Sequence, residues 1–543
     1  MGAAMIWTVA AGAAAALASW WALSALSRFV WRPRAIARAF RAQGVGGPDY
    51  QFLVGNLLEM KRLIAEAAGL ALDAGCHDYG ALVQPHLRKL NGWPSTVRES
   101  ESAYVYVLDH FLHTHMHAGR TFVSWFGEKP QLFMGGVNMV QQVLSDRTGL
   151  FTKNPVNDHF TRGLGKGLIL IDGDEWKRHR KVVHPVFNLD KLKMLAVTVS
   201  GCFRSVVSDW ETKLEKGNGE LEIEISCQFG EIAADVISYV AFGRNHKEAK
   251  EVHLIQKELQ YLVFYSLFND VLSHISVFRY LPTKNNLKMW RLQRKVRSIL
   301  INITESRLAA KDTTGYGNDM LGLILEACAP EQVQNPLMSI DEIIEECKTF
   351  YLAGHETTTQ MLTWTMFLLS THGEWQQTLR EEVLSECGNE IPTGDMLNKL
   401  KLVNMFILET LRLYAPVSLT QRIAGSDVEL NGIRVPKGTI LTIPIKTIHR
   451  DKELWGEDAD EFKPTRFENG ATRAAKHPNA FVPFSSGPRA CVGQNFAMIE
   501  VKVVVAMILQ RFSVTISPKY VHAPKDVFTI CPKYGLPVVL RSL

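Results

Sequence analysis

The chain has 543 residues, of which 46% are hydrophobic and 21% charged, and its formal net charge is +5 at pH 7. This balance indicates a large packed core and excludes a disordered or low-complexity protein. The small basic excess does not indicate a nucleic-acid-binding protein, because its clearest cluster follows an apolar segment at the N-terminus, which is a membrane-topology pattern.

The first element in chain order is that apolar segment, which has no charged side chain between Ala3 and Ser27. Five arginines follow it, at positions 28, 32, 34, 38 and 41. The segment is long enough to cross a bilayer as a helix, and the basic flank is expected on the cytosolic side. A cleaved signal peptide would have a positive region first, and residues 1–4 carry no side-chain charge. The sequence therefore predicts an uncleaved transmembrane anchor.

We expect three parts along the chain: the anchor over residues 1–30, a basic Gly/Pro hinge over 31–50 and one catalytic domain over 51–543. The eight cysteines show no close pairing and no CxxC motif, which fits a reducing compartment. These features together predict a single-pass protein of the endoplasmic reticulum membrane, with its catalytic domain on the cytosolic face and in contact with membrane lipid.

One early region does not fit a simple pattern of elements. Residues 91–114 are long and irregular for a connection between an early helix and the strand-like run 121–126. We interpret them either as an extra surface loop or as a translated intron. Nearby, His113, His115 and His117 lie on one face of an extended chain and could bind a metal, although a solvated polar loop is the interpretation that we favour.

The next motif is the run Gly173-Asp-Glu-Trp-Lys-Arg-His-Arg180. Trp176 and Arg180 are four residues apart and therefore share one face of a predicted helix. An indole N–H and a guanidinium are suitable donors to the carboxylates of a bound ligand. Lys177, Arg178 and Lys181 are expected to be solvated basic residues on the same helix.

From about residue 188 to 371, apolar residues recur at spacings of three and four with few breakers, which predicts a mainly helical region. Its last helix is expected from Ser339 to Thr371, with Ser339 and Glu342 forming a capping box.

In the middle of that helix lies Ala353-Gly-His-Glu-Thr-Thr358. A mid-helix glycine is costly, and Thr357 can bond back to the carbonyl of Ala353, so a local widening is expected. Such a groove can hold dioxygen and water. Glu356 beside Thr357 is an acid next to an alcohol, a pair that can deliver protons.

Further along, Glu409 and Arg412 share one helix face, although an isolated pair of this kind carries little information. A second arginine follows at Arg466 in the run Pro464-Thr-Arg-Phe467. The residues 428–430 and 433–435 flank an Asn-Gly pair, which predicts a β-hairpin.

The most informative motif is the turn around Cys491. Gly487 and Gly493 permit close approach of a flat ligand, and Arg489 can face a carboxylate on it. A helix is expected from about 494 to 511, and its positive N-terminal end favours a thiolate. A thiolate in this setting can bind haem iron. A buried structural cysteine is the alternative.

The run Phe484-x-x-Gly487-x-Arg489-x-Cys491-x-Gly493 resembles the haem-binding signature of the cytochrome P450 family. The three further motifs match the same family in its order, so the resemblance covers nearly the whole chain. It implies a mainly α fold with small β-sheets, preceded by one N-terminal transmembrane helix. It also implies haem b with Cys491 as axial ligand.

The resemblance assigns further roles to individual residues. It marks Trp176 and Arg180 as haem propionate ligands, with Arg489, Phe484 and Gly493 also contacting haem. It marks Glu356 and Thr357 for oxygen activation, and it places Glu409, Arg412 and Arg466 in a buried structural network. By analogy, the substrate pocket is lined by Phe350, Ala353, Val417, Leu419 and Phe528.

The activity that this resemblance implies is that of a monooxygenase using O2. Electrons are expected from NADPH through a separate reductase, because the sequence shows no dinucleotide-binding fingerprint. Several stretches look similar to the plant clan 72 enzymes, and a fatty acid or a small hormone-like lipid or terpenoid is the favoured substrate. The alternatives are a cytokinin, gibberellin or brassinosteroid hydroxylase, a haem-thiolate isomerase or dehydratase, and a non-catalytic haem sensor.

Overall fold

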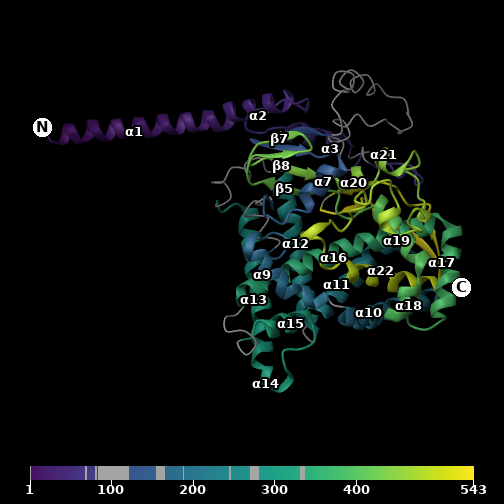
Figure 1. Cartoon of the computed structure of the whole chain (residues 1–543). Helices are drawn as coiled ribbons and strands as arrows, with labels where there is room; N and C mark the ends of the chain where they lie inside the picture. Colours follow the sequence, from purple (N-terminus) through teal and green to yellow (C-terminus); the bar gives the residue numbers. More distant parts are fainter. Residues whose placement is uncertain are drawn as a thin grey trace. The chain divides into compact units, whose positions relative to one another are not determined.

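The structure is a computed structural model, and it describes residues 2–67, 70–79, 82, 121–153, 165–187, 189–243, 246–269, 281–329, 337–526 and 528–543. The predicted loop at 91–114 and the histidines at 113, 115 and 117 lie outside these residues. The chain divides into two units. Unit 1 comprises Met1–Ala68, Gln84–Thr152 and Gln421–Pro444, and unit 2 comprises Gly69–Val83, Lys153–Thr420 and Ile445–Leu543. The ribbon is mainly helical with small sheets, as predicted (Figure 1).

Unit 1 begins with three consecutive helical segments: α1 (Gly2–Leu26), the π-helical η1 (Ser27–Trp31) and α2 (Arg32–Arg41). Every side chain from Ala10 to Arg28 is exposed, although most of α1 is apolar. By length and composition, the stretch Ala10–Arg41 is able to cross a membrane. The helix α11 (Ile225–Phe242) in unit 2 passes the same test, but more than half of it is buried, as in a core helix.

Unit 1 also contains a five-stranded sheet with the order β1-β2-β8-β5-β3. Its strands are β1 (Phe122–Phe126), β2 (Lys129–Phe133), β3 (Phe151–Thr152), β5 (Thr420–Ala424) and β8 (Ile440–Ile443). β1 and β2 are antiparallel, whereas β2 and β8 are parallel. The unit also contains α3 (Leu57–Ala67), α7 (Val137–Leu144) and the hairpin β6 (Val428–Leu430) and β7 (Ile433–Val435). The turn of this hairpin has positive φ at Asn431 and Gly432, as the sequence predicts.

Unit 2 contains most of the helices. In its N-terminal part lie α9 (Gly173–Val183), η2 (His184–Phe187), α10 (Leu189–Lys216), α11, α12 (His246–Asn269), α13 (Lys284–Ala309), α14 (Lys311–Thr314) and α15 (Met320–Ala327). They are followed by α16 (Ile340–Thr371), α17 (Gly373–Cys387), α18 (Gly394–Lys399), α19 (Lys401–Leu413), α20 (Ile445–Ile448), α21 (Lys452–Trp455) and α22 (Gln494–Leu509). Short 3-10 turns are η6 (Pro464–Phe467), η7 (Ala471–Arg473) and η8 (Gly487–Arg489).

Two small sheets complete unit 2. One has the strand order β4-β12-β9, and the other pairs β10 with β11. Their strands are β4 (Glu220–Glu224), β9 (Phe512–Ile516), β10 (Pro524–Asp526), β11 (Ile530–Pro532) and β12 (Pro537–Ser542). The antiparallel pairing of β4 with β12 joins the middle of the chain to its C-terminal end.

The long helix α16 is the central element of unit 2 and contacts α11, α19 and α22 (Figure 1). Its N-terminus has the predicted capping box, because the Ser339 hydroxyl accepts from Glu342 N and the Glu342 side chain accepts from Ser339 N. The element is a continuous α-helix from Ile340 to Thr371. A side chain at Gly354 would lie 2.8 Å from Ile237 Cδ1, so the glycine allows α11 to approach α16 closely.

Candidate functional site

The turn that carries Cys491 is shaped by backbone hydrogen bonds. Ala490 N donates to Gly487 O at 3.1 Å, and Cys491 N donates to Phe484 O at 2.9 Å. Gly487 has φ of +71°, a conformation that glycine adopts at little cost. Gly493 is the N-cap residue of α22, so the cysteine lies just before the positive end of a helix, as predicted.

The thiol of Cys491 is in a desolvated setting with positive groups close by. Burial raises its pKa, whereas a hydrogen bond from Gly493 N–H and the charge of Arg180 act in the opposite direction. The residue nevertheless keeps an exposed surface, unlike the packed thiols of Cys347 and Cys387. A cysteine residue with exposed surface and a desolvated thiol suits a metal ligand, because a bound metal removes the thiol proton that burial otherwise retains.

The helix α9 meets the cysteine turn through the two predicted propionate ligands. Arg180 Nη1 donates to Ala490 O at 3.1 Å. The guanidinium of Arg489 lies 4.5 Å from the centroid of the Trp176 ring, a cation–π contact. The structure thus brings Trp176, Arg180 and Arg489 together beside Cys491.

Asp172 is a partner of Arg489 that sequence reasoning missed. Its carboxylate forms an ion pair with Arg489 and also caps α9 by accepting from Gly173 N at 2.9 Å. Arg489 in addition donates to Ile171 O at 3.0 Å. An aspartate directly before an acidic first turn is a recognisable N-cap signal, but the ion pair joins residues more than 300 positions apart and has no local signal.

The prediction that Arg178 is solvated was wrong. Its guanidinium donates to both carboxylate oxygens of Glu342, at 2.5 and 3.0 Å, and to Leu337 O at 2.5 Å. The hydrogen bonds from Arg178 lower the pKa of Glu342 to about 2. Lys177 and Lys181 are exposed, as expected.

In the middle of α16, Thr357 Oγ1 donates to Ala353 O at 2.5 Å, which confirms the predicted back-bond. Glu356 is partly exposed and accepts from Thr529 Oγ1 at 3.0 Å and from Gln360 Nε2 at 3.2 Å. The acid and the alcohol thus have hydrogen-bond partners in unit 2, while the widened groove stays a prediction.

His355 also makes contacts in this region that the sequence did not indicate. Its Nε2 atom is 3.0 Å from Gly230 O, and its ring centroid is 4.2 Å from that of His253. Burial lowers the pKa of His355 to about 4 and that of His253 to about 3. A histidine between a glycine and a glutamate in a sequence gives no signal of such a distant partner.

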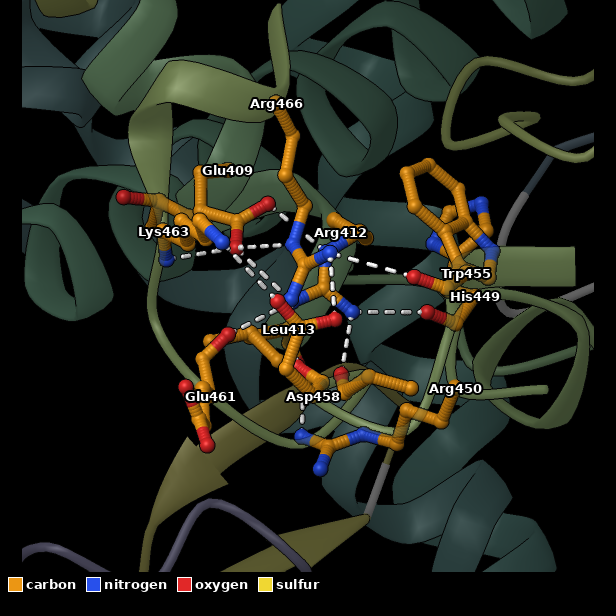
Figure 2. Close-up of polar contacts among 12 residues, drawn as sticks. Glu409, Arg412, Leu413, His449, Arg450, Trp455, Asp458, Glu461, Lys463 and Arg466 are labelled. Carbon is orange, nitrogen blue, oxygen red and sulfur yellow. Dashed lines mark hydrogen bonds and ion pairs between the residues drawn. The ribbon is translucent and has the colours of Figure 1, made fainter. Parts of the chain in front are cut away.

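Glu409 and Arg412 form an ion pair at 2.7 Å between two side chains with no exposed surface. Arg412 also donates to the carbonyls of His449, Ala459 and Glu461, at 2.9, 2.5 and 2.8 Å. Figure 2 shows Arg412 surrounded by Glu409, His449 and Glu461. Since a buried charge is stable only when it is fully paired, this set of contacts explains how the arginine is tolerated in the core.

Arg466 completes the contacts of Glu409. Its Nε atom is 3.5 Å from Glu409 Oε1, and Lys463 N donates to the same oxygen at 2.8 Å (Figure 2). Arg466 also forms an ion pair with Asp458 at 2.9 Å. The three residues of the predicted network therefore lie in contact.

His449 links this network to the cysteine turn. Its carbonyl accepts from Arg412, and its Nε2 atom accepts from Val482 N at 2.9 Å, just before the turn begins. Burial, and next the charge of Arg412, lower the pKa of His449 to about 3. The neighbouring Arg450 is also buried and pairs with Asp460 at 3.2 Å. Sequence reasoning identified neither residue.

Four of the five predicted pocket residues lie on segments that meet near Glu356. Ile530 N donates to Pro416 O at 3.0 Å, which joins the segment of Val417 and Leu419 to that of Phe528. The bond from Thr529 to Glu356 then ties Phe528 to the α16 turn that contains Ala353. Phe350 is buried, with its ring centroid 6.1 Å from that of Phe187.

An accessible cysteine before a core helix, with arginines and a tryptophan at its side in a mainly helical unit, is typical of haem-thiolate oxidoreductases. The comparisons with known proteins agree. The family model "Cytochrome P450" matches residues 107–535. Cytochrome P450 709B3 of Arabidopsis thaliana is 42% identical over 515 residues, 94% of each chain. Cytochrome P450 734A6 of Oryza sativa subsp. japonica is 38% identical over 535 residues, 96% of this chain and 94% of the relative.

A third relative, cytochrome P450 72A13 of Arabidopsis thaliana, is 35% identical over 544 residues, 99% of both chains. The chain therefore belongs to the cytochrome P450 family, as a monooxygenase related to the plant clan 72 enzymes. The family implies a haem with a cysteine thiolate ligand and O2 as a substrate. The exposed apolar N-terminal helix is typical of membrane-anchored plant members.

Replacing Arg412 by methionine is expected to destabilise unit 2 strongly. The change leaves Glu409 buried without its closest cation and three carbonyls without a donor, a loss of about 3–5 kcal/mol in the free energy of unfolding. Thermal denaturation measures this loss, with Lys452→Met as control, because the ion pair of Lys452 with Glu457 is exposed. Equal midpoints for the two variants would contradict the assigned role of the network.

Replacing His449 by glutamine is expected to reduce the acid sensitivity of the protein. The folded pKa of about 3 lies below the unfolded value of about 6.5, so the stability linked to His449 is complete above pH 6.5 and is lost as the pH falls towards 3. Between pH 7 and pH 5 this loss is about 2 kcal/mol.

The glutamine oxygen can still accept from Val482 N. The measurement is the difference in thermal midpoint between pH 7 and pH 5 for the parent, for His449→Gln and for the exposed-site control His184→Gln. The difference should shrink in His449→Gln alone. An unchanged difference in that variant would show that His449 is not buried in its neutral form.

Proposed function

We propose that the protein is a membrane-anchored monooxygenase that hydroxylates a small apolar substrate, a fatty acid or a hormone-like lipid or terpenoid. Its electrons come from NADPH through a separate reductase. The observation that carries the proposal is the partly exposed Cys491 residue, whose thiol lies in a desolvated setting beside Arg180 and the Gly493 N–H. Membership of the P450 family supports the reaction type.

The residues around the turn fit a haem. Cys491 would hold the iron, and the guanidinium and indole groups of Arg180, Arg489 and Trp176 would face the propionates. The ion pair with Asp172 orients the Arg489 guanidinium, which would then be available to a propionate. Phe484 and Gly493 border the porphyrin in this proposal. The bound haem supplies the activation of dioxygen.

In this proposal, Glu356 and Thr357 on α16 deliver the protons that the reaction consumes. Thr357 is held by its bond to Ala353 O, which orients the hydroxyl along the helix. Glu356 is held by Thr529 and Gln360, and its partly exposed carboxylate can take a proton from solvent. In the proposed relay, a water carries this proton to the Thr357 hydroxyl oxygen, which gives up its own proton towards the reacting centre in the same step. The network of Glu409, Arg412 and Arg466 has a structural role and stabilises the core below the cysteine turn.

The substrate enters, in this proposal, where the segments of Val417, Leu419 and Phe528 meet α16 at Ala353. Buried Phe350 would shape the inner end of that space. Apolar side chains dominate this set, which supports an apolar substrate whose position is fixed by shape. The names of the relatives specify families and no substrate.

For location, we propose that residues 1–30 anchor the chain in the endoplasmic reticulum membrane as a single span, that 31–50 form the hinge, and that 51–543 form the catalytic domain in the cytosol. The exposed apolar surface of α1 and the arginines that follow it support this arrangement.

The direct test is incubation of the full chain and a reductase with NADPH and a panel of plant lipids and hormones, read by mass spectrometry. We expect one class of lipid to gain one oxygen atom. In Thr357→Ala, the loss of the hydroxyl should lower the product formed per NADPH several-fold, with peroxide or water formed instead. Thr357→Ser keeps a hydroxyl and should retain most of the coupling. A yield per NADPH that is the same in all three proteins would refute the proton-delivery role.

Cys491→Ser should abolish the thiolate-type absorption spectrum of the reduced carbon monoxide complex, because an alcohol is a much weaker donor to iron. Absorption spectroscopy of the membrane fraction measures this. Cys227→Ser is the matched control, since Cys227 is also an exposed cysteine in unit 2. A thiolate-type spectrum that persisted in Cys491→Ser would show that another residue binds the iron.

A further inference from the structure

A cluster of potential metal ligands lies between α9 and the first turns of α16, within unit 2. Glu175 and His179 are four residues apart on one face of α9, and Glu342 lies in the first turn of α16. One ligand atom from each of these three residues lies within 4.8 Å of the other two. One imidazole and two carboxylates form a donor set that suits a divalent transition-metal ion.

The environment of His179 is that of a metal ligand rather than of an ordinary buried histidine. The residue has no exposed surface, and its Nδ1 atom lies 2.6 Å from Oε1 of the equally buried Glu346. Its Nε2 atom is buried and has no hydrogen-bond partner among the described residues. When Nδ1–H donates to the carboxylate, Nε2 carries a lone pair that points away from Glu346. Metal-binding histidines have this carboxylate–imidazole arrangement.

The distance from His179 Nε2 to Glu342 Oε1 is 3.5 Å. Two ligand atoms that each lie about 2.1 Å from a tetrahedral ion are roughly 3.4 Å apart, so the gap matches without movement of the helices. It exceeds the length of a good hydrogen bond. The side chains of Glu342 and Glu175 are 27% and 36% exposed, so an ion can reach the buried nitrogen from solvent.

The basic groups beside the cluster do not neutralise all of its carboxylates, which favours binding of a cation. Three carboxylates, on Glu175, Glu342 and Glu346, face two basic partners, because Arg178 binds Glu342 and Lys166 lies 3.6 Å from Glu175. Arg178 binds both oxygens of the Glu342 carboxylate, including the Oε1 atom that faces His179, and Ser339 N donates to Oε2. Hydrogen bonds of this kind orient a ligating carboxylate. Oε1 keeps a second lone pair that can bind a metal ion.

We propose that Glu175, His179 and Glu342 form a binding site for Zn²⁺ or a similar divalent ion, with Glu346 as the orienting partner of His179 and water in the fourth position. The site ties α9, which carries Trp176 and Arg180, to α16. It is separate from the cysteine turn and does not depend on the proposed substrate.

The test uses the full-length, haem-loaded protein with His113, His115 and His117 replaced by alanine, so that this histidine run cannot bind metal. Equilibrium dialysis against buffered Zn²⁺, followed by mass-spectrometric metal analysis, gives the stoichiometry and the Kd. Glu175→Gln should lose one Zn²⁺ per chain or weaken its Kd at least tenfold. Asp174→Asn is the matched control, because Asp174 is the exposed neighbour that pairs only with Lys177 among the ion pairs described.

A second readout separates binding at this site from binding elsewhere. Zn²⁺ should raise the thermal midpoint of the parent and of Asp174→Asn, and should leave that of Glu175→Gln unchanged, because only a ligand bound to the folded state stabilises it. Glu346→Gln should weaken the Kd by about 10–100-fold if it folds. Equal stoichiometry and equal Kd in the parent, Glu175→Gln and Asp174→Asn would overturn the proposal and leave His179 as a hydrogen-bond partner of Glu346.

Discussion

A buried guanidinium that must be fully paired is the constraint on which the rest of unit 2 depends. Arg412 has five donor hydrogens and no exposed side-chain surface. Each of these donors that lacked an acceptor would cost more free energy than a typical hydrogen bond contributes. Glu409 and three carbonyls meet this demand, and those carbonyls belong to segments that follow α19 in the sequence. The arginine thereby fixes the path of the chain from His449 to Glu461.

The same constraint extends to the chemistry at Cys491. The His449 carbonyl accepts a hydrogen bond from Arg412, and its Nε2 atom accepts one from Val482 N. Through these two bonds, Arg412 helps to position the segment just before the cysteine turn. At the end of that turn, burial favours the neutral thiol while Arg180 and Gly493 favour the thiolate. The balance explains why a metal is needed to hold the sulfur in its charged form: without one, the cost of desolvation dominates.

Features that depend on neighbours in the sequence could be predicted. The capping box at Ser339 and the back-bond of Thr357 each join residues at most four positions apart, and the hairpin at Asn431 pairs residues at most seven positions apart. Each of these predictions was correct. The mainly helical class followed from periodicity and from the family resemblance. What could not be predicted are charge pairs between distant segments, because an arginine on an amphipathic helix gives the same local pattern whether it faces water or a carboxylate. Arg178 with Glu342 and Arg489 with Asp172 are of this kind. The hydrogen bond from Val482 N to the His449 ring also joins distant segments and has no local signal.

These missed pairs have a common physical consequence for α9. Arg178 and His179 hold one side of this helix against α16, while Arg180 and Trp176 face the cysteine turn on another side. A short helix with polar contacts on both sides cannot shift towards one of them without weakening the other. The two carboxylates of α16 that bind α9 precede Glu356 by ten and fourteen positions, on the same rigid helix. The position of the acid–alcohol pair relative to the cysteine turn is therefore set by polar contacts that lie outside both motifs.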